Sequence, residues 1–482
     1  LIEQFGDNEK AGPYSVYSGG LWVRTSLNPE LQEYTKDALR GGLLRYSSGK
    51  GWSGPINKIE IDDKWAQRLN STYINTDFAN WQIAVAIRPT GGGAEIGFSD
   101  GTTGRIDSVP SALKTGDIIA VSPLGGSSYR LENVPEVSGG MVVQNPRNGR
   151  IWAMQGGFDD RMSSFNRATQ AERQPGSTIK PFVYATALDN GMTPATLIAD
   201  APFCVYQSAS LGRKCFQNFG NSRGAGEQTL RWGVEQSRNL MTVRAANDSG
   251  MENVVKTIKT MGIGDYKPYL AFALGAGDTT VMKLTNAYSM LANHGRELKP
   301  TVIDFVQDRK GNVIFRADKR ACENCNLRDW DGQPMPRPRP TGKQLMDPMT
   351  AYQMIDIMQG VRPLFGKTGT TSGPTNVWFV GGSPDMVAGV YLGYDQPRNM
   401  GGYAQGGTLA APIFRRFAER AMAGMPKTPF VAPRGVRMVR VDRKTGKRVY
   451  GGWPTDDPKS AVIWDVFKPE TEPRRSIRKD EL

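Results

Sequence analysis

The amino-acid sequence predicts a multidomain α/β (α+β) protein, in which a small OB-like β-barrel precedes an antiparallel sheet flanked by a helical region. The length of 482 residues supports more than one domain, because a single hydrophobic core rarely organises so long a chain. Short strand patterns separated by glycine turns fill residues 51–135, which is typical of a small barrel. From about residue 138, strand patterns at both ends enclose a series of helical patterns, which indicates one sheet packed against helices.

The N-terminal part is predicted to form two units. Residues 1–50 are expected to be a linker region, and residues 51–135 an OB-like β domain. In the second unit, apolar and polar residues alternate between turns, as in a strand with one buried face. The elements expected in these two units are a strand at 21–25, a helix from Pro29 to about Leu44, and strands at 81–88, 94–98 and 115–121.

Residues 136–430 are predicted to form the α/β domain. An Asn-Pro-Arg-Asn-Gly turn at 145–149 separates two apolar runs, which indicates a β-hairpin. The strands expected in this domain are 141–144, 150–154, 365–371, 376–382 and 386–394. The helices expected there are 177–190, 228–247, 250–261, 279–293, 347–360 and 411–424, with a polyproline loop at 334–340.

Residues 431–482 are predicted to be a basic, proline-rich C-terminal extension. A hairpin is expected at 441–449, and the chain beyond it is expected to be loosely ordered. The chain has no apolar run of 18 residues, so no membrane span is predicted in it, and its first residues do not resemble a signal peptide. Because it does not begin with Met, we expect a fragment or a processed product.

Composition excludes some chemistry and leaves other choices open. The formal net charge is +13, which fits nucleic acid, an anionic membrane surface or an acidic cell-wall polymer as a partner. The single histidine, His294, lies in an Asn-His-Gly run that predicts a turn. Mechanisms that need several imidazoles, including most zinc hydrolase sites, are therefore excluded, and we predict no metal and no cofactor.

The four cysteines allow two interpretations. Cys204 with Cys215 and Cys322 with Cys325 would form two local disulfides in an oxidising compartment. Alternatively, all four could bind one zinc ion, but no second Cys-x-x-Cys or histidine pair supports that arrangement. We favour the two disulfides.

Three short motifs carry the predicted chemistry, and Ser177-Thr-Ile-Lys180 is the first. A Gln-Pro-Gly turn precedes Ser177, which opens a helical pattern. The spacing of three residues places Lys180 on the same helix face as Ser177, where amine and hydroxyl can meet. The positive end of the helix dipole would favour an oxyanion beside the serine. The alternative interpretation is an N-capping serine with a solvated lysine.

The second motif, Ser237-Arg-Asn239, could complete the proton transfer. Lys180 can act as a base only when neutral, so its pKa must fall by about 3 units through burial and nearby positive charge. We expect Lys367 to supply that charge, Ser237 to relay protons, and Asn239 to orient Lys180 or a substrate amide. Taken alone, this motif could be a polar turn between helices.

The third motif, Lys367-Thr368-Gly369-Thr370-Thr371, is predicted to lie on an edge strand. An edge strand can pair with an extended peptide, and Gly369 permits close approach of the backbones. Lys367 and the threonine hydroxyls could bind a substrate carboxylate.

The order of these motifs resembles that of the penicillin-recognising serine acyltransferases. The surrounding residues are similar to class A (bifunctional) penicillin-binding proteins over about residues 138–424. The segments that carry the similarity are Ser164-Phe-Asn-Arg-Ala-Thr169, Arg173-Gln-Pro-Gly-Ser177, Ser237-Arg-Asn-Leu-Met-Thr242 and Gly366-Lys-Thr-Gly-Thr-Thr371. Residues 51–135 resemble the OB-like insertion of one subgroup, and residues 1–50 resemble the linker after its glycosyltransferase domain.

The resemblance implies the penicillin-binding transpeptidase fold and a D,D-transpeptidase that cross-links peptidoglycan. Ser177 would be acylated by a stem peptide ending in D-Ala-D-Ala, and an amine of a neighbouring stem would take up the acyl group. The oxyanion hole would be the backbone N–H groups of Ser177 and Thr370. β-Lactams would acylate the same serine. Cell-wall synthesis proteins are expected partners, and the periplasmic side of the bacterial inner membrane is the expected location.

The chain also departs from the family pattern. The glycosyltransferase domain and the membrane anchor expected of the full-length protein are absent from it. The connection at 360–363 is shorter than usual, and Asn376 stands where the family often has an acidic residue. A serine β-lactamase or D,D-carboxypeptidase, a silent scaffold, and a non-catalytic OB-type nucleic-acid binder are the alternatives. The lactamase pattern Glu-x-x-Leu-Asn and a dense aromatic and basic alternation are not found, so we predict no nucleic-acid partner.

Overall fold

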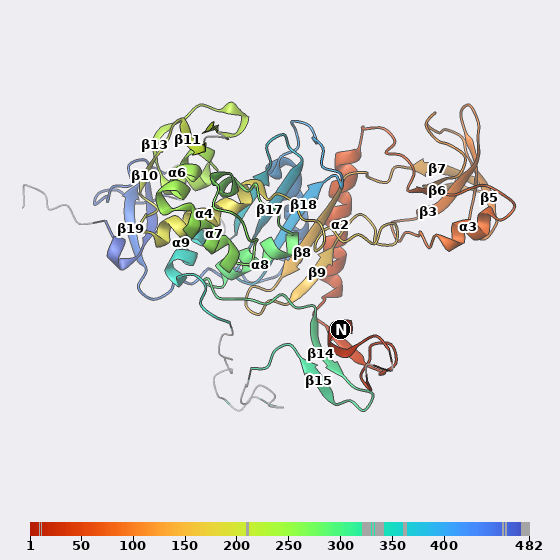
Figure 1. Ribbon diagram of the computed structural model, residues 1–482, viewed down its shortest axis with the longest axis horizontal. Coiled ribbons are helices and arrows are strands. Elements are labelled where there is room, and N and C mark those ends of the chain that lie inside the picture. Colours follow the sequence, from red (N-terminus) through yellow and green to blue (C-terminus); the bar gives the residue numbers. More distant parts are fainter. Residues whose placement is uncertain are drawn as a thin grey trace, which may run out of the picture.

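A five-stranded antiparallel sheet lies at the centre of the computed structural model (Figure 1). The structure describes residues 1–8, 10, 12–208, 212–320, 329, 332, 342–359, 364–455, 457 and 460–473. The strands, in order across the sheet, are β16 (Phe365–Thr370), β17 (Asn376–Gly382), β18 (Val387–Gly393), β8 (Ser138–Gln144) and β9 (Ile151–Gln155). The predicted strands are confirmed, and β16 lies at the edge of the sheet, as expected.

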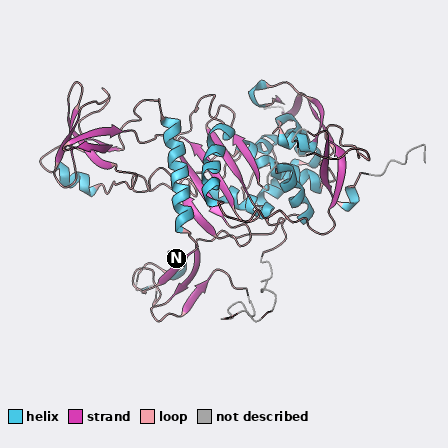
Figure 2. Ribbon diagram, turned by 180° about the vertical axis from the view of Figure 1, so that it is seen from behind, coloured by secondary structure: helices cyan, strands magenta, loops and turns pink. Residues whose placement is uncertain are grey.

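Helices cover both faces of this sheet (Figure 2). On one face, α2 (Pro29–Ser47) and α10 (Ala411–Ala421) pack on side chains such as Met141 and Val143. On the other face, Val142 packs in the core that contains α8 (Val281–Ala292). Because both faces are covered, the inner strands β8 and β18 are buried at every position, whereas burial alternates along the edge strand β16.

Helix α2 begins within the region predicted as a linker. The side chain of Asn28 accepts the backbone N–H of Leu31 at 3.0 Å, and Pro29 occupies the first helical position. Ala38, Leu39 and Leu43 are buried against the sheet. The linker region therefore supplies one of the layers that surround the sheet.

The helical region contains α4 to α9, and one expected helix is wrong. The range 228–247 forms two helices, α5 (Leu230–Glu235) and α6 (Asn239–Ser249). The chain breaks between them because Ser237 adopts a φ of 53°, which no α-helix contains. The remaining helices are α4 (Lys180–Asp189), α7 (Met251–Thr260) and α9 (Pro348–Met358), close to their expected positions.

A closed barrel projects from one end of the molecule (Figure 1). Its strands are β3 (Gln82–Pro89), β4 (Ala94–Gly97), β5 (Thr103–Ile106), β6 (Asp117–Gly125) and β7 (Ser128–Glu132). Strand β7 pairs with both β5 and β6 and so closes the barrel. Beside it lie β2 (Asn57–Lys58), which pairs with β6, and α3 (Trp65–Ser71). A small closed barrel agrees with the expectation, and its assignment as an OB-like domain stays a prediction.

Several smaller elements surround the two domains. They are α1 (Ile2–Phe5), the sheet of β1 (Trp22–Thr25), β14 (Ile303–Gln307) and β15 (Val313–Arg316), the pair β10 (Leu197–Asp200) and β13 (Gly226–Thr229), and the hairpin β11 (Phe203–Ser208) and β12 (Gly212–Phe216). The predicted polyproline loop, the connection at 360–363, and Cys322 and Cys325 lie outside the described residues.

The C-terminal extension corrects a second prediction. The expected hairpin at 441–449 forms: Val441 makes an antiparallel bridge with Arg448, and the backbone N–H of Asp442 donates to the Lys447 carbonyl at 2.8 Å. Strand β19 (Arg437–Asp442) also pairs with β20 (Val462–Phe467), in the part of the chain that is expected to be loosely ordered. Residues 462–467 are therefore ordered, because Val466 and Phe467 are fully buried. In the described part of the chain, no helix has the length and hydropathy to cross a membrane.

Candidate active site

Ser177 lies in a tight turn that rests directly on the edge strand β16. The turn is η2 (Gly176–Ile179), and it leads into α4. Gly176 has a φ of 52°, and a Cβ there would lie 2.7 Å from the carbonyl oxygen of Thr370. A Cβ on Gly369 would collide with the carbonyl of Pro175. These two glycines therefore bring the serine turn and the strand into backbone contact.

Buried aromatic side chains hold the same turn in place. The indole N–H of Trp378 donates to the carbonyl of Gln174 at 2.9 Å, and the Tyr288 hydroxyl donates to the carbonyl of Thr178 at 2.7 Å. Both rings are completely buried. The position of Ser177 is thus determined by the sheet and the helical core together.

Lys180 lies one turn after Ser177 and is completely buried. Its Nζ donates to the Ser237 carbonyl at 2.6 Å and to Asn239 Oδ1 at 2.7 Å, and it lies 3.4 Å from Ser237 Oγ. Burial, followed by the positive charges of Lys367 and Arg238, lowers the pKa of Lys180 well below its usual range. A lowered pKa favours the neutral amine, which is the form of lysine that can accept a proton.

Lys367 reaches the same serine from β16. Its Nζ donates to Ser237 Oγ at 2.8 Å and to the carbonyl of Thr368 at 3.2 Å, and the residue is 7% exposed. Burial lowers the pKa of Lys367 to about 8. The two amines therefore converge on the Ser237 hydroxyl from segments far apart in the chain.

The backbone of Ser237 produces this convergence. A φ of 53° is unfavourable for a non-glycine residue and costs about 1–3 kcal/mol. In this conformation the carbonyl and the hydroxyl of Ser237 both face Lys180. The sequence shows no glycine at this position, so neither the strain nor the break in the helix could be predicted from it.

Two residues that the sequence did not single out support Asn239. Asn218 Oδ1 accepts the backbone N–H of Asn239 at 2.9 Å, and Asn218 donates to the buried Asp200 at 2.9 Å. Arg238 forms an ion pair with the same Asp200 at 2.7 Å. Burial raises the pKa of Asp200, but the hydrogen bonds from Arg238 and Asn218 outweigh burial, so the pKa is lowered. No motif marks this network, because its members meet only in the folded chain.

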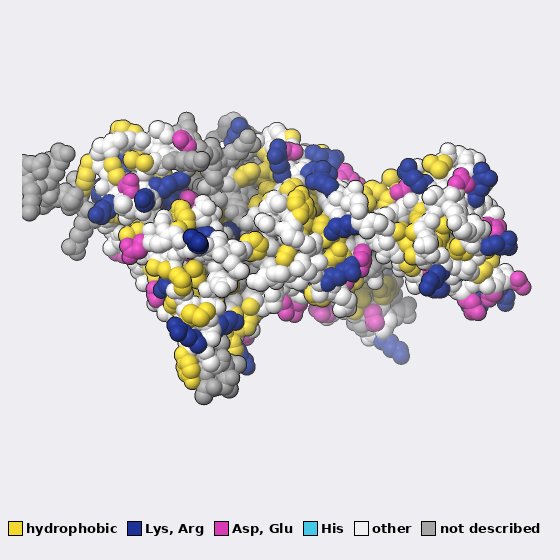
Figure 3. All heavy atoms as spheres, turned by 90° about the horizontal axis from the view of Figure 1, so that it is seen from above, with side chains coloured by type: hydrophobic (Ala, Val, Ile, Leu, Met, Phe, Trp, Pro, Cys, Tyr) yellow, Lys and Arg dark blue, Asp and Glu magenta, His cyan; other side chains and the backbone are white. Residues whose placement is uncertain are grey.

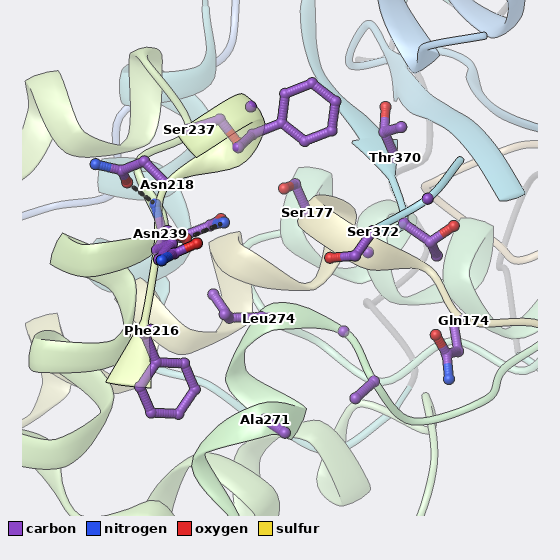
Figure 4. Close-up of a pocket in the computed structure, with 18 of the residues that line it drawn as sticks. Gln174, Ser177, Phe216, Asn218, Ser237, Asn239, Ala271, Leu274, Thr370 and Ser372 are labelled. Atoms are coloured by element: carbon purple, nitrogen blue, oxygen red, sulfur yellow. Dashed lines mark hydrogen bonds between the residues drawn. The ribbon is translucent and has the colours of Figure 1, made fainter. Parts of the chain in front are cut away.

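An open cleft of about 740 Å³ lies in front of these groups (Figure 4). Ser177, Ser237 and Asn239 line it from the helical side, and Thr370 lines it from β16. The β12 end of the disulfide-bonded hairpin, including Phe216, forms a further wall that the sequence did not predict as part of the site. We call this space the serine cleft.

The structure brings the predicted site residues together. Thr368 and Thr371 also line the serine cleft, whereas Gly369 lies behind it against the Ser177 turn. Lys180 and Lys367 lie beneath its surface and contact it through Ser237. Asn376, which stands where the family often has an acidic residue, is buried, and its backbone N–H donates to Thr371 Oγ1 at 3.0 Å.

The structure tests the predictions made for Cys204, Cys215 and His294, which lie among the described residues. Cys204 and Cys215 form a disulfide, as predicted, so these two sulfurs cannot act as zinc-binding thiolates. His294 lies in the turn after α8 with a φ of 56°, which agrees with the predicted turn. It is not among the residues that line the serine cleft.

The fold described above and the three motifs in its cleft are together the features of the penicillin-recognising serine acyltransferases. Residues 139–419 match the family model described as the penicillin-binding protein transpeptidase domain. The chain therefore belongs to the penicillin-binding transpeptidase family.

The curated relatives show which members of this family the chain resembles in sequence. The chain is 34% identical to penicillin-binding protein 1A of Rickettsia prowazekii over 464 residues, which cover 90% of this chain and 59% of that protein. It is 30% identical to penicillin-binding protein 1A of Neisseria flavescens over 470 residues, which cover 90% of this chain and 56% of that protein. The chain thus spans less than two thirds of the length of these relatives.

Solved structures share the fold. The crystal structure of penicillin-binding protein 1A from Haemophilus influenzae superposes with a TM-score of 0.77 at 24% identity, over 99% of this chain and 75% of that chain. The PonA1 protein of Mycobacterium tuberculosis, solved in complex with penicillin V, gives a TM-score of 0.59 at 18% identity, over 94% of this chain and 96% of that chain.

Proposed function

We propose that this chain is a peptidoglycan D,D-transpeptidase whose nucleophile is Ser177. The observation that carries the proposal is the meeting of Lys180 and Lys367 on the Ser237 hydroxyl, at the base of the cleft that Ser177 lines. A neutral lysine beside a serine, with a second amine nearby, is the arrangement that activates a hydroxyl for acyl transfer.

Acylation would begin when neutral Lys180 takes the proton of the Ser177 hydroxyl. The Oγ atom attacks the carbonyl between the two D-alanines of a stem peptide, and backbone N–H groups of Ser177 and Thr370 stabilise the oxyanion. The C–N bond then breaks, and the departing D-Ala amine takes its proton through Ser237. Asn239, which holds Lys180 Nζ at 2.7 Å, keeps the base in position.

The strand β16 would bind the donor peptide. It is the edge strand of the sheet, bridged only at Phe365 by Gln359 among the described residues, so an extended peptide could pair along its remainder. The Lys367 ammonium and the Thr368 hydroxyl would bind the terminal carboxylate, and Thr371 would contact the peptide further along the strand. A β-lactam would present the same carbonyl and carboxylate and would acylate Ser177, but its leaving group would stay attached.

Labelling with a fluorescent penicillin tests this proposal. We expect an adduct of one penicillin in the intact mass, mapped to the peptide that contains Ser177, and its loss in Ser177→Ala. Ser108→Ala, an exposed serine on the barrel, is the matched control and should label normally. Rapid release of hydrolysed penicillin would instead identify a β-lactamase, and absence of an adduct would favour a silent scaffold. Release of D-Ala without cross-linking would identify a carboxypeptidase.

We further propose that the enzyme acts on the periplasmic side of the bacterial inner membrane, together with other cell-wall synthesis proteins. The Cys204–Cys215 disulfide supports an oxidising compartment. A nucleic-acid role for the barrel has little support, because residues 51–135 contain seven Lys and Arg against nine Asp and Glu. On the face seen in Figure 3, basic side chains are distributed along the molecule rather than gathered on the barrel.

A further inference from the structure

An open cleft of about 620 Å³ lies on the closed barrel and shares no lining residue with the serine cleft. Helix α3 and the segment after it line one side, and β3, β7 and the turn between β4 and β5 line the other. The volume falls within the range of about 300–1,000 Å³ that is common for ligand sites. We call this space the barrel cleft.

The segment between α3 and β3, which lines the barrel cleft, is anchored to the α/β domain. The backbone N–H of Asn75 donates to the carbonyl of Arg161 at 3.2 Å. The ring centroid of Trp81 lies 4.8 Å from that of Phe78 and 5.7 Å from that of Phe158. A ligand in the barrel cleft would therefore be held at a fixed place relative to the α/β domain.

Aromatic side chains from several elements meet in the barrel cleft. Phe98 follows β4 and Tyr129 belongs to β7, and their ring centroids lie 4.9 Å apart. Trp81 precedes β3 and, like these two, is half-buried, whereas Tyr73 after α3 is exposed. Such rings offer flat apolar surfaces on which the flat faces of a ligand can stack.

Tyr73 occupies a position where a tyrosine does not favour the fold. It follows the end of α3 with a φ of 55°, in the left-handed region where helices commonly place Gly or Asn. The residue is 88% exposed, so the packing of its ring compensates little of the strain. Backbone strain of this kind gathers at ligand sites. The combination indicates a ring held out for a ligand.

The polar groups of the barrel cleft indicate a neutral ligand. Among the described residues that line it, Asp100 is the only charged one. Its carboxylate already accepts the backbone N–H of Thr102 at 2.9 Å and the Thr102 hydroxyl at 2.6 Å. A polyphosphate backbone would need cations that this lining lacks. Amide and hydroxyl groups that suit a neutral, hydroxyl-rich ligand come from Asn70, Asn75, Gln82 and Ser99.

Aliphatic surface lies among these amides. Leu69, Ile74 and Ile83 also line the barrel cleft. Sugar hydroxyl groups gain nothing from aliphatic contacts, whereas an acetamido group combines a methyl group with an amide N–H and C=O. The mixture of aliphatic and amide groups therefore fits sugars that carry acetamido groups.

We propose that the barrel cleft binds a neutral glycan of N-acetylated sugars, whose ring faces stack on Tyr73 and Trp81. The amide of Gln82 bonds to the acetamido groups. The identification of this glycan with the strand that carries the stem peptides rests on the proposed function. Binding at the barrel cleft would then keep a polymeric substrate on the protein between successive acylations of Ser177.

Calorimetric titration with two β-1,4-linked oligosaccharides tests the proposal. Chitohexaose carries acetamido groups where cellohexaose carries hydroxyl groups. We expect chitohexaose to bind, and cellohexaose to bind about fivefold more weakly or worse. Tyr73→Ala should weaken chitohexaose binding by about fivefold or more, because a stacking surface is lost, whereas Tyr73→Phe should bind normally. Gln82→Ala, at an exposed position, should also weaken it.

Matched controls separate this inference from the proposed function. Tyr17→Ala removes a tyrosine that is 78% exposed and lies outside the barrel cleft, and it should bind normally. Penicillin labelling should be the same in Tyr73→Ala and in the unaltered protein. Absence of labelling in the unaltered protein would remove the proposed function, but glycan binding would still be measurable.

Three outcomes would overturn the assignment of the barrel cleft. Binding of neither oligosaccharide at millimolar concentration is the result expected if a protein partner occupies the cleft instead. Equal binding of cellohexaose and chitohexaose would exclude recognition of the acetamido group. If Tyr73→Ala bound chitohexaose as tightly as Tyr17→Ala does, the glycan would lie elsewhere on the protein.

Discussion

Lys180 and Lys367 share the Ser237 hydroxyl, and their surroundings give the two lysines different roles. Burial is the main cause that lowers the pKa of Lys180 well below its usual range, and the charges of Lys367 and Arg238 add to it. Burial lowers the pKa of Lys367 to about 8. In the proposed mechanism Lys180 serves as the base, which its lowered pKa favours, whereas Lys367 keeps most of its charge near neutral pH and can bind a carboxylate.

This difference predicts the pH dependence of acylation. The rate constant for penicillin acylation should fall as the pH rises through about 8, because Lys367 loses the proton that binds the carboxylate. In Lys367→Arg the guanidinium stays charged, so the alkaline fall should disappear even if the maximal rate is lower. Stopped-flow labelling between pH 6 and about 10 measures both profiles. An unchanged alkaline limb in the variant would contradict the role of Lys367.

Two substitutions at Ser237 separate the effect of its backbone strain on stability from the effect of its hydroxyl on acylation. Ser237→Gly relieves the positive φ and should raise the free energy of unfolding by up to about 1 kcal/mol. Ser237→Ala keeps the strain. Both variants lose the hydroxyl that joins the two lysines, so we expect acylation to fall by about 10² or more in each. Thermal unfolding and penicillin labelling give the two readouts, and normal labelling of either variant would exclude a proton relay.

Site residues that belong to short sequence motifs could be predicted from the sequence, and site residues outside such motifs could not. Ser177 and Lys180 are predicted because a turn signal precedes a Ser-x-x-Lys pair, and Lys367 because it precedes Thr-Gly within a predicted edge strand. Asp200 and Asn218 lie on either side of a hairpin and support Asn239 only after folding. Their residue types are ordinary for turns, so their sequence context carries no signal.

At the scale of elements, the contact between the Ser177 turn and β16 is the feature that assembles the site. It depends on Gly176, where a Cβ would lie 2.7 Å from the Thr370 carbonyl. Gly176→Ala should therefore abolish penicillin labelling and destabilise the protein through both the clash and the positive φ.

Gly262→Ala is the matched control for that substitution. Gly262 has a φ of 70°, but a Cβ there would have open space around it. It should cost only about 1 kcal/mol of unfolding free energy and leave labelling unaffected. Equal destabilisation of the two variants in chemical unfolding, with labelling retained in Gly176→Ala, would show that the close approach is not required.

Element type was predictable from periodicity, whereas element continuity was not. The strands of the central sheet were recognised because they are short apolar runs between turns. Residues 228–247 have helical periodicity, and the helix breaks at Ser237, where the backbone has a positive φ and its carbonyl accepts from Lys180. The bridge between Val441 and Arg448 confirms the predicted hairpin at 441–449, whereas the pairing of β19 with the more distant β20 has no local signal in the sequence.

At the scale of the whole molecule, the C-terminal extension joins the catalytic domain through a buried cluster of charges. Arg231 lies between Asp356 and Asp465, and the side chain of Asp465 is 2% exposed. Burial lowers the pKa of Arg231, but these two carboxylates outweigh burial, so the pKa is raised. From its composition the extension is expected to be loosely ordered beyond the hairpin. Its order depends on partners from a different part of the chain, such as Arg231, which its own sequence does not reveal.

Asp465→Asn is the substitution that tests this connection. It leaves the buried guanidinium of Arg231 only partly compensated, so we expect the free energy of unfolding to fall by about 2–4 kcal/mol. Glu419→Gln breaks an exposed ion pair with Arg415 and should cause no measurable change. If Asp465→Asn were as stable as Glu419→Gln in chemical unfolding, this cluster would not hold the extension on the domain.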